Sequence, residues 1–307
     1  MQLRHLLSIK DLEANQIQSV FQRAALLKDR GFAPIRYHQA TALVFAENST
    51  RTRVSFERAS QELGKPVVNL QPEQSSLEKG ESLLDTLENI GALQCDLAII
   101  RCTDEKLLRD TAAESPMAII NAGDGAREHP TQALLDLFTL WDGMAKRDWD
   151  RLRKLKVAIV GDLIRSRVAR SWAELAVRMD LAVDFVSPAS WKPQSWDCKF
   201  SWSDEFKPRL AEWDAVMALR VQKERFRETA GAAESEIQKY IATYQMGPAD
   251  FISPQQKLLH PGPVNWGIEL HQGLKSDSRS LILDQVNCGL YVRAALIEIF
   301  SSEGKKL

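Results

Sequence analysis

The sequence predicts an α/β protein of two domains, each built from a parallel β-sheet flanked by helices. Its 307 residues suffice for about two domains of ordinary size. Short, continuously apolar runs alternate with amphipathic helical patterns, which is typical of βαβ units whose strands are covered on both faces. A polar, charged stretch at Gly143–Asp150 interrupts the alternation. We therefore expect domains at residues 1–143 and 144–285, followed by a C-terminal helical segment at 286–307.

The first half of the chain begins with a helical pattern whose apolar face runs from Ile17 to Leu27 and which ends at Gly31. Further helical patterns are found at Ser82–Ala92 and Thr131–Trp141. The strands expected in this half are Ala42–Phe45, Val67–Leu70, Leu97–Ile100 and Met117–Ile120. Helices between successive strands predict βαβ units and hence a parallel sheet.

The second half repeats the pattern with a longer connection. Its expected strands are Val157–Val160, Val183–Val186, Ala215–Leu219 and Lys257–Leu259. Ser187–Pro208 carries three tryptophans among prolines and serines, and a connection packed by its own aromatic rings is favoured over a stacking site. The last helical pattern, Cys288–Phe300, has no partner nearby in the sequence. We expect that helix to cross back to the first domain.

Composition excludes several classes of protein. The formal net charge is −1, so there is no basic field that would favour nucleic acid. The four cysteines lie far apart without a CxxC pair, which favours reduced thiols and a cytoplasmic location over disulfides or a zinc site. The first residues become charged too early for a secretory signal, and no apolar run approaches the roughly 20 residues that span a bilayer. We expect no nucleic-acid or membrane partner.

The most informative segment is Ser49-Thr50-Arg51-Thr52-Arg53, which lies between an apolar run and a helical pattern. The N-terminus of a helix favours negative charge, because its backbone N–H groups and dipole point toward the ligand. Arginine adds a planar fork that matches phosphate geometry. This segment predicts an anion site. A capping serine or threonine beside two solvated arginines is the alternative.

Cationic and hydrogen-bonding side chains also follow the other predicted strands. In parallel sheets ligands bind beyond the carboxyl ends of the strands. His129 precedes Pro130, a residue suited to the first helical turn, so we expect His129 and Gln132 at the exposed start of a helix. For His129 the alternative is a capping role, and for Lys79 it is a solvated surface lysine. The polar segments after the remaining strands are Gln74–Gly80, Arg101, Gly161–Arg167, Arg220–Arg225 and His260–Pro263. Together they predict a site for small, multiply charged anions.

Metal and nucleotide motifs are missing from the sequence. It contains neither HExxH nor a clustered His/Cys set, and neither a GxSxG elbow nor a Walker motif. The sequence therefore gives no indication of a metal site or of a Walker-type nucleotide site.

These motifs, taken in order, resemble those of aspartate carbamoyltransferase catalytic subunits, within the aspartate/ornithine carbamoyltransferase superfamily. The resemblance covers nearly the whole chain. It rests on the segments Phe45–Arg53, Ser75–Glu81, His129–Asp136, Ser166–Ser171 and Arg220–Phe226. The ornithine enzymes use a Ser-Met-Gly loop and a His-Cys-Leu-Pro motif, where this chain has Arg220-Val221-Gln222 and His260-Pro261-Gly262-Pro263. An ornithine-type transferase and a catalytically silent anion-binding homologue are the alternatives.

The resemblance implies transfer of a carbamoyl group from carbamoyl phosphate to L-aspartate, a step of pyrimidine biosynthesis, without a metal or cofactor. The catalytic set would be Thr52, Lys79, Arg101 and His129. Carbamoyl phosphate would be bound by Ser49, Thr50, Arg51, Thr52, Arg101, His129 and Gln132. Aspartate would be bound by Lys79, Arg167, Arg220, Gln222, Gly262 and Pro263. The domain at 1–143 would bind carbamoyl phosphate and that at 144–285 aspartate, while Arg53 would be structural.

The resemblance also implies a homotrimer in which Ser75 and Lys79 enter the site of a neighbouring subunit. Ser75 is selected over Ser76 because the family serine lies four residues before the lysine. Whether the protein binds a regulatory chain or a dihydroorotase partner stays open, because relatives differ in their partners. The chain departs from the family pattern at Cys102, Trp266 and Cys288. An ion pair that relatives make through an arginine at position 266 is therefore not expected here.

Overall fold

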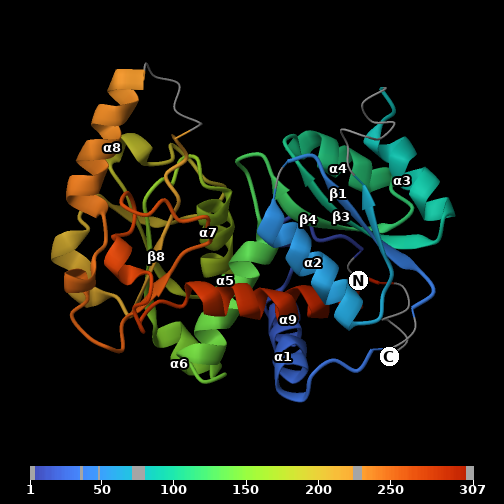
Figure 1. Ribbon diagram of the computed structural model, residues 1–307, viewed down its shortest axis with the longest axis horizontal. Coiled ribbons are helices and arrows are strands. Elements are labelled where there is room, and N and C mark those ends of the chain that lie inside the picture. The colour runs from blue at the N-terminus through green and yellow to red at the C-terminus, as the bar shows by residue number, and fades with distance from the viewer. Residues whose placement is uncertain (1–3, 35–36, 48, 71–79, 224–229, 302–307) are drawn as a thin grey trace. The chain divides into compact units, whose positions relative to one another are not determined.

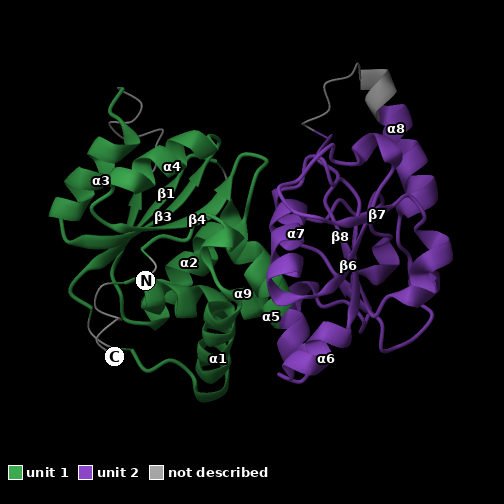
Figure 2. Ribbon diagram, turned by 180° about the vertical axis from the view of Figure 1, so that it is seen from behind, with its two compact units in different colours: residues 1–138, 286–307 green, residues 139–285 purple. Residues whose placement is uncertain are grey.

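The computed structural model describes residues 4–34, 37–47, 49–70, 80–223 and 230–301 of the chain (Figure 1). It contains two compact units, one of residues 1–138 and 286–307 and the other of residues 139–285 (Figure 2). The predicted loop residues Ser75, Ser76 and Lys79 lie outside the described residues.

The first unit is built on a parallel four-stranded sheet with the strand order β2-β1-β3-β4. Its strands are β1 (Ala40–Phe45), β2 (Val67–Leu70), β3 (Cys95–Cys102) and β4 (Ala118–Asp124). All four predicted strands are confirmed. β4 extends beyond its predicted end because Asn121 and Asp124, although polar, are buried and hydrogen-bonded. An apolar-run criterion cannot detect such residues.

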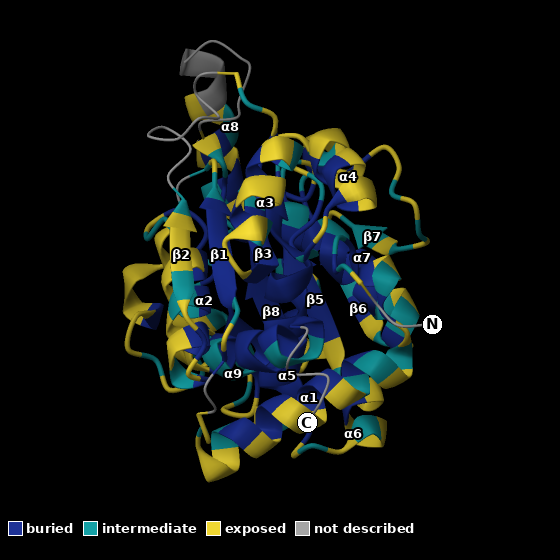
Figure 3. Ribbon diagram, turned by 90° about the vertical axis from the view of Figure 1, so that its right-hand side faces the viewer, coloured by how far each residue is buried: buried dark blue, intermediate teal, exposed yellow. Residues whose placement is uncertain are grey.

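Helices cover this sheet and bury its central strands. The helices of the unit are α1 (Ala14–Arg30), α2 (Thr50–Glu62), α3 (Leu83–Ala92) and α4 (Glu105–Glu114), together with the start of α5 (Pro130–Gly143) and most of α9 (Ile282–Phe300). On one face Leu87 of α3 and Leu108 of α4 pack in one cluster with Ile100 of β3. β1 is buried whereas the edge strand β2 is largely exposed (Figure 3).

The C-terminal helix α9 packs on the first unit, which confirms the predicted crossing. Arg23 of α1 donates hydrogen bonds to Glu298 of α9 over 2.6 Å. The rings of Phe32 and Tyr291 stack with centroids 5.7 Å apart. The helix begins at Ile282, six residues before its predicted start at Cys288. Most of α9 is thus part of the first unit, although it is the last element of the chain.

The second unit has a parallel five-stranded sheet with the order β7-β6-β5-β8-β9. Its strands are β5 (Lys156–Val160), β6 (Ala182–Val186), β7 (Ser201–Ser203), β8 (Ala215–Ala218) and β9 (Lys257–Leu259), and its helices are α6 (Trp149–Lys154), α7 (Arg167–Met179) and α8 (Ala230–Tyr244). Four strands confirm the prediction. β7 was not predicted, because this short edge strand has no buried residue and no apolar run. Similarly, α6 occupies a stretch expected to be a polar connection, and Asp148 caps it.

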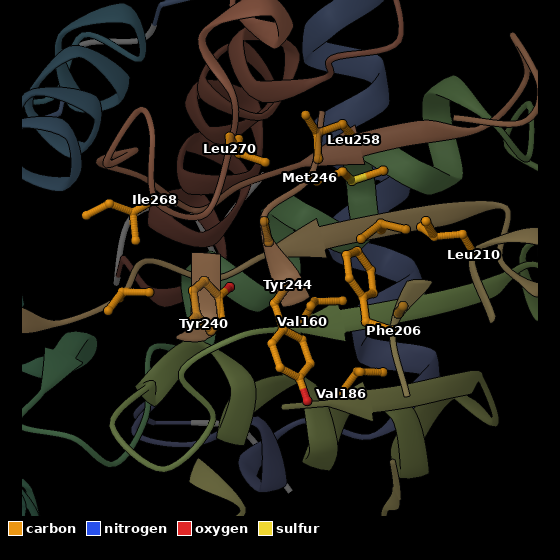
Figure 4. Packing of buried hydrophobic residues seen from close by; sticks show 14 of the residues in the cluster. Val160, Val186, Phe206, Leu210, Tyr240, Tyr244, Met246, Leu258, Ile268 and Leu270 are labelled. Atoms are coloured by element: carbon orange, nitrogen blue, oxygen red, sulfur yellow. The ribbon is translucent and has the colours of Figure 1, made fainter. Parts of the chain in front are cut away.

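Aromatic rings pack among aliphatic side chains in the core of the second unit (Figure 4). Trp191 is fully buried and stacks on Tyr240 with ring centroids 4.9 Å apart. Trp196 packs against Phe185 with centroids 5.1 Å apart. Trp196 also packs on Phe200 of the same connection, with centroids 4.5 Å apart, so Ser187–Pro208 packs partly through its own aromatic rings, as predicted, and partly against β6 and α8.

Short 3-10 turns connect the main elements, at Ile9–Asp11, Ala189–Trp191, Lys207–Glu212, Pro248–Asp250 and Gln272–Leu274. Within the described ranges, no helix is long and apolar enough to cross a membrane. All four cysteines are free thiols, of which only Cys198 is partly exposed.

Candidate active site

The anion-binding segment of the first unit lies between β1 and α2. Ser49 is the N-cap of α2 with an extended φ of −153°, and its carbonyl accepts a hydrogen bond from the backbone N–H of Arg53 at 3.1 Å. Of the groups that the structure describes, none makes a capping hydrogen bond to the Ser49 hydroxyl, so the capping alternative loses support. The side chains of Thr50 and Arg51 are exposed. A helix start with exposed hydroxyl and guanidinium groups suits an anion.

Thr52 and His129 come together beside this helix start. Thr52 Oγ1 lies 3.5 Å from His129 Nε2, and Thr131 Oγ1 lies 3.5 Å from His129 Nδ1. The expected exposure of His129 and Gln132 is wrong, since their exposed fractions are only 5% and 9%. The cause is tertiary packing: Thr52, at the start of α2, lies against His129 at the start of α5. A helix pattern in the sequence reports only the periodicity of its own face.

Arg101 is fixed at the end of β3. It pairs with Phe45 in the β1–β3 register, and its Nε donates to Glu47 Oε2 at 3.2 Å. Its side chain is only 11% exposed. Glu47 was not among the predicted site residues. The pairing of β1 with β3 therefore places the Arg101 guanidinium beside the segment that leads to Ser49.

The turn that precedes His129 contains two buried acidic residues, Asp124 and Glu128. Glu128 donates its backbone N–H to Asp124 Oδ1 at 2.6 Å, and its carboxylate accepts from Ser8 Oγ at 2.6 Å and from the N–H of Ile9 at 3.1 Å. Burial is the main cause that raises the pKa of Asp124 from 3.8 to about 6. The turn fixes the backbone immediately before His129, and neither carboxylate was predicted to be part of the site.

In the second unit, Asp162 connects the loops that follow β5 and β8. Its carboxylate accepts from the N–H of Gln222 at 3.2 Å and from Arg165 Nη1 at 3.0 Å. Gln222 Nε2 in turn donates to the backbone carbonyl of Arg165 at 2.5 Å. Burial raises the pKa of Asp162, although Arg165 opposes the shift. Gln222 is therefore held at the same edge of the sheet as the start of α7, where Arg167 is the first residue.

The loop after β9 is tied to the loop after β8. Asn265 Nδ2 donates to the carbonyl of Val221 at 3.0 Å. His260 Nδ1 accepts from the N–H of Gly262 at 2.8 Å, and His260 Nε2 lies 3.1 Å from Glu269 Oε1, both side chains being fully buried. Gly262 has a φ of +67°, which favours glycine, and a cis peptide bond joins it to Pro263. Half-buried Arg220 follows β8 directly, at the same edge as Gln222 and Gly262.

The side chains of the remaining singled-out residues have surface or packing roles. Arg53 is exposed and pairs with Glu57 at 3.9 Å. Cys102 is buried in the core, where desolvation is the main cause that raises its pKa to about 11. Trp266 packs against the core of the second unit. Cys288 is buried and accepts from Lys28 Nζ at 3.8 Å.

Both units thus carry polar and cationic side chains at the carboxyl ends of parallel strands. The first holds a helix start suited to an oxyanion, together with Thr52, Arg101 and His129. The second carries Arg167, Arg220 and Gln222. Over the described part of the chain, no group of three or more His, Cys, Asp or Glu side chains could hold a metal ion. Fold and site define a two-domain α/β protein built to bind small, multiply charged anions.

Comparison with known proteins identifies the family. Residues 4–142 match the carbamoyl-P binding domain of the aspartate/ornithine carbamoyltransferases, and residues 153–300 match their Asp/Orn binding domain. The chain belongs to the aspartate/ornithine carbamoyltransferase family. It is 38% identical to the aspartate carbamoyltransferase catalytic subunit of Sorangium cellulosum over 99% of this chain and 94% of that protein. It is also 38% identical to the Thermus thermophilus catalytic subunit, over 96% and 97% of the two chains.

Solved structures resemble the fold closely. Aspartate transcarbamoylase from Trypanosoma cruzi in complex with aspartate and phosphate superposes with a TM-score of 0.84 at 25% identity, covering 96% of both chains. The same enzyme in complex with carbamoyl phosphate gives a TM-score of 0.84 at 26% identity, again over 96% of each chain. The catalytic subunit from M. jannaschii gives 0.80 at 29% identity over 97% of each.

We predict that Asp124→Asn changes the pH dependence of stability. Because the pKa of Asp124 is raised from 3.8 to about 6 in the fold, its stabilising contribution is fully present below 3.8 and is lost as pH rises through about 6. Between about pH 5 and pH 7 the wild-type protein should lose on the order of 1 kcal/mol more unfolding free energy than the variant. Urea unfolding across this range measures the difference. Parallel pH curves for the two proteins would contradict the assignment.

Proposed function

We propose that the protein is an aspartate carbamoyltransferase, which transfers the carbamoyl group of carbamoyl phosphate to L-aspartate in pyrimidine biosynthesis. The observation that carries this proposal is the segment Ser49–Arg53 at the start of α2, with Thr52 beside His129. The bacterial relatives at 38% identity, named aspartate carbamoyltransferases, support the same reaction.

The phosphate group is bound at the start of α2. The hydroxyls of Ser49 and Thr50 donate to its oxygens, together with backbone N–H groups at the start of the helix. The Arg51 guanidinium binds two phosphate oxygens at once, as its fork geometry allows. These contacts stabilise the phosphate both in the substrate and as the leaving group.

The carbonyl oxygen of the carbamoyl group receives the developing negative charge. The aspartate amine attacks the carbonyl carbon, a tetrahedral intermediate forms, and the C–O bond to phosphate breaks with its electron pair. The proton that the amine loses during these steps passes to phosphate or to solvent. Thr52, Arg101 and His129 donate to the carbonyl oxygen, each preorganised donor contributing about 3 kcal/mol to transition-state stabilisation. His129 donates when its proton is on Nε2, and in that tautomer Nδ1 can accept from the Thr131 hydroxyl, 3.5 Å away.

Aspartate is bound by the second unit. Arg167, Arg220 and Gln222, with the backbone of Gly262 and Pro263, orient its two carboxylates so that the amine meets the carbonyl carbon. The arginines also set the choice of substrate, because they attract a dicarboxylate and repel the ammonium group of ornithine. The buried Asp162 supports this arrangement, since it holds the N–H of Gln222.

The assembly proposed for activity is a homotrimer in which Ser75 and Lys79 of one subunit complete the site of the next. Lys79 contacts both phosphate and aspartate in this scheme. The free thiols of the chain fit a reducing compartment, and we propose a cytoplasmic location. No cofactor, nucleic acid or membrane takes part, and a regulatory chain or dihydroorotase partner would bind outside the site.

A carbamoylation assay with purified protein tests the function. Aspartate and ornithine are offered separately with carbamoyl phosphate, and we expect turnover of aspartate only. Arg51→Ala should lower kcat/KM by roughly 10²- to 10³-fold with an unchanged melting temperature. Arg53→Ala is the matched control, because Arg53 pairs with Glu57 on the helix surface, and it should keep near wild-type activity. Turnover of ornithine alone, or full activity in Arg51→Ala, would reject the assignment.

Shared sites can be tested with mixed subunits. Lys79→Ala and Arg51→Ala proteins should each be inactive, and dissociating and reassembling them together should restore activity. The physical reason is that a shared site can combine an intact Arg51 of one chain with an intact Lys79 of its neighbour. Mixing Arg51→Ala with Arg101→Ala should restore none, since both residues belong to the same site of one chain. Persistent inactivity of the first mixture would count against subunit-shared sites.

A further inference from the structure

One peptide group of the second unit is hydrogen-bonded to the loops on both sides of it. The strand order places β8 between β5 and β9. In the loop after β8, the N–H of Gln222 donates to Asp162 Oδ2, in the loop after β5, at 3.2 Å. The carbonyl of Val221, which belongs to the same peptide group, accepts from Asn265 Nδ2, in the loop after β9, at 3.0 Å. Because the N–H and C=O of a trans peptide point in opposite directions, this group bridges the three loops.

Strand pairing alone does not set the spacing of these loops. The register between β8 and β9 ends at the pair Met217 and Leu259, before Arg220 on one strand and Gly262 on the other. Beyond that pair, the side chain of Asn265 connects the two loops. The distance between the proposed aspartate-binding residues of the two loops therefore depends on where Asn265 is held.

Asn265 is held by a buried pair, Glu269 and His260. The backbone N–H of Asn265 donates to Glu269 Oε1 at 2.6 Å, and His260 Nε2 lies 3.1 Å from the same oxygen. Both side chains are fully buried. His260 Nδ1 accepts from the N–H of Gly262 at 2.8 Å, and a backbone N–H can only donate, so Nδ1 carries no proton and Nε2 carries one. His260 therefore donates to Glu269.

The imidazole of His260 thus connects the start of the loop after β9 with its end. At the start, it accepts from Gly262, whose φ of +67° lies in the region that favours glycine. At the end, it donates to Glu269, the residue that holds the backbone of Asn265. The backbone N–H of His260 is fixed as well, because it donates to Oε1 of the buried Gln285 at 2.8 Å. The whole loop is one hydrogen-bonded unit, which Asn265 attaches to the loop after β8.

We propose that His260, Glu269 and Asn265 are positioning residues that fix the spacing between the aspartate-binding residues of the loop after β8 and those of the loop after β9. This inference rests on the proposed function, in which both loops bind aspartate. A site of fixed spacing discriminates by chain length, since a dicarboxylate one methylene longer must displace a loop or leave a carboxylate poorly paired. The network therefore selects four-carbon over five-carbon dicarboxylates.

Two unreactive dicarboxylates measure that spacing. Succinate has the four-carbon chain of aspartate and glutarate has one methylene more, and neither carries an amine that could be carbamoylated. Isothermal titration calorimetry with purified full-length protein gives the affinity for inorganic phosphate and then, with phosphate at saturation, the affinities for the two dicarboxylates. We expect the wild-type protein to bind succinate about tenfold more tightly than glutarate, as one methylene allows.

Variants of Glu269 and Asn265 should change the ratio of the two affinities. Glu269→Met removes the acceptor of two hydrogen bonds and should weaken succinate about tenfold but glutarate less than about threefold. Glu269→Gln should keep the wild-type ratio, because the partners donate both bonds and an amide oxygen accepts them equally. Asn265→Ala keeps the backbone N–H and removes the bond to Val221, and it should also lower the ratio. Phosphate affinity should stay within about twofold throughout, because the start of α2 belongs to the other unit.

Gln256→Met is the matched control for stability. Gln256 is buried in the same unit but directly precedes β9, at the opposite end of that strand, and its Nε2 donates to the carbonyls of Leu210 and Trp213 at 2.7 and 2.9 Å. Its loss should lower the melting temperature and leave the affinity ratio unchanged. Because Asn265 and Glu269 act in series, the double variant Asn265→Ala/Glu269→Met should lose no more succinate affinity than the weaker-binding single variant. Asn265→Ala alone, at a half-buried position, tests the proposal even if Glu269→Met fails to fold.

The outcomes distinguish the inference from the function beneath it. Equal wild-type affinities for the two dicarboxylates, an unchanged ratio in Asn265→Ala, a ratio lowered as much by Gln256→Met, or additive losses in the double variant would each overturn the positioning role alone. Failure of the wild-type protein to bind phosphate or succinate would overturn the proposed function and the inference with it. A lowered ratio in Asn265→Ala and Glu269→Met, with phosphate binding retained, supports both.

Discussion

The pairing of parallel strands β1, β3 and β4 is the constraint on which the cluster of Ser49, Thr52, Arg101 and His129 depends. Because the three strands run in the same direction, the residues that follow them meet at one edge of the sheet, although Ser49, Arg101 and His129 are far apart in sequence. The register that pairs Phe45 with Arg101 fixes the position of the Arg101 guanidinium along the edge of the sheet. A slip of one residue would turn Arg101 into the core.

Buried carboxylates stabilise the loops that these strand ends carry. In the first unit Glu128 holds the turn before His129, and in the second unit Asp162 and Glu269 hold the loops after β5, β8 and β9. Each accepts backbone or side-chain hydrogen bonds that compensate for its desolvation. The cationic side chains at the strand ends therefore lie beside loops whose backbones are fixed by buried carboxyl groups.

The sequence predicts the strands well because central parallel strands are continuously apolar. β7 escapes prediction since it is a three-residue edge strand with half-exposed tryptophan and serine. The motif residues of the site could be named from their order along the chain. The burial of these residues could not be predicted from the sequence. His129 is the clearest case, because residues distant in the sequence cover it. The buried Arg293 was not predicted because a single arginine in an apolar helix gives no periodic signal, and Ser55, which accepts its hydrogen bond, is distant in the sequence.

The position of α9 has a consequence for the order in which the protein matures during synthesis. The helix is translated last, yet it completes the first unit by packing against α1 and α2. At the other end of the chain, Leu6 hydrogen-bonds with the backbone beside Ile120 and adds to the edge of the same sheet. A nascent chain can assemble its second unit, residues 139–285, before the first is complete. The unit of residues 1–138 and 286–307 therefore cannot reach its final structure until α9 has been synthesised, although most of that unit is translated first.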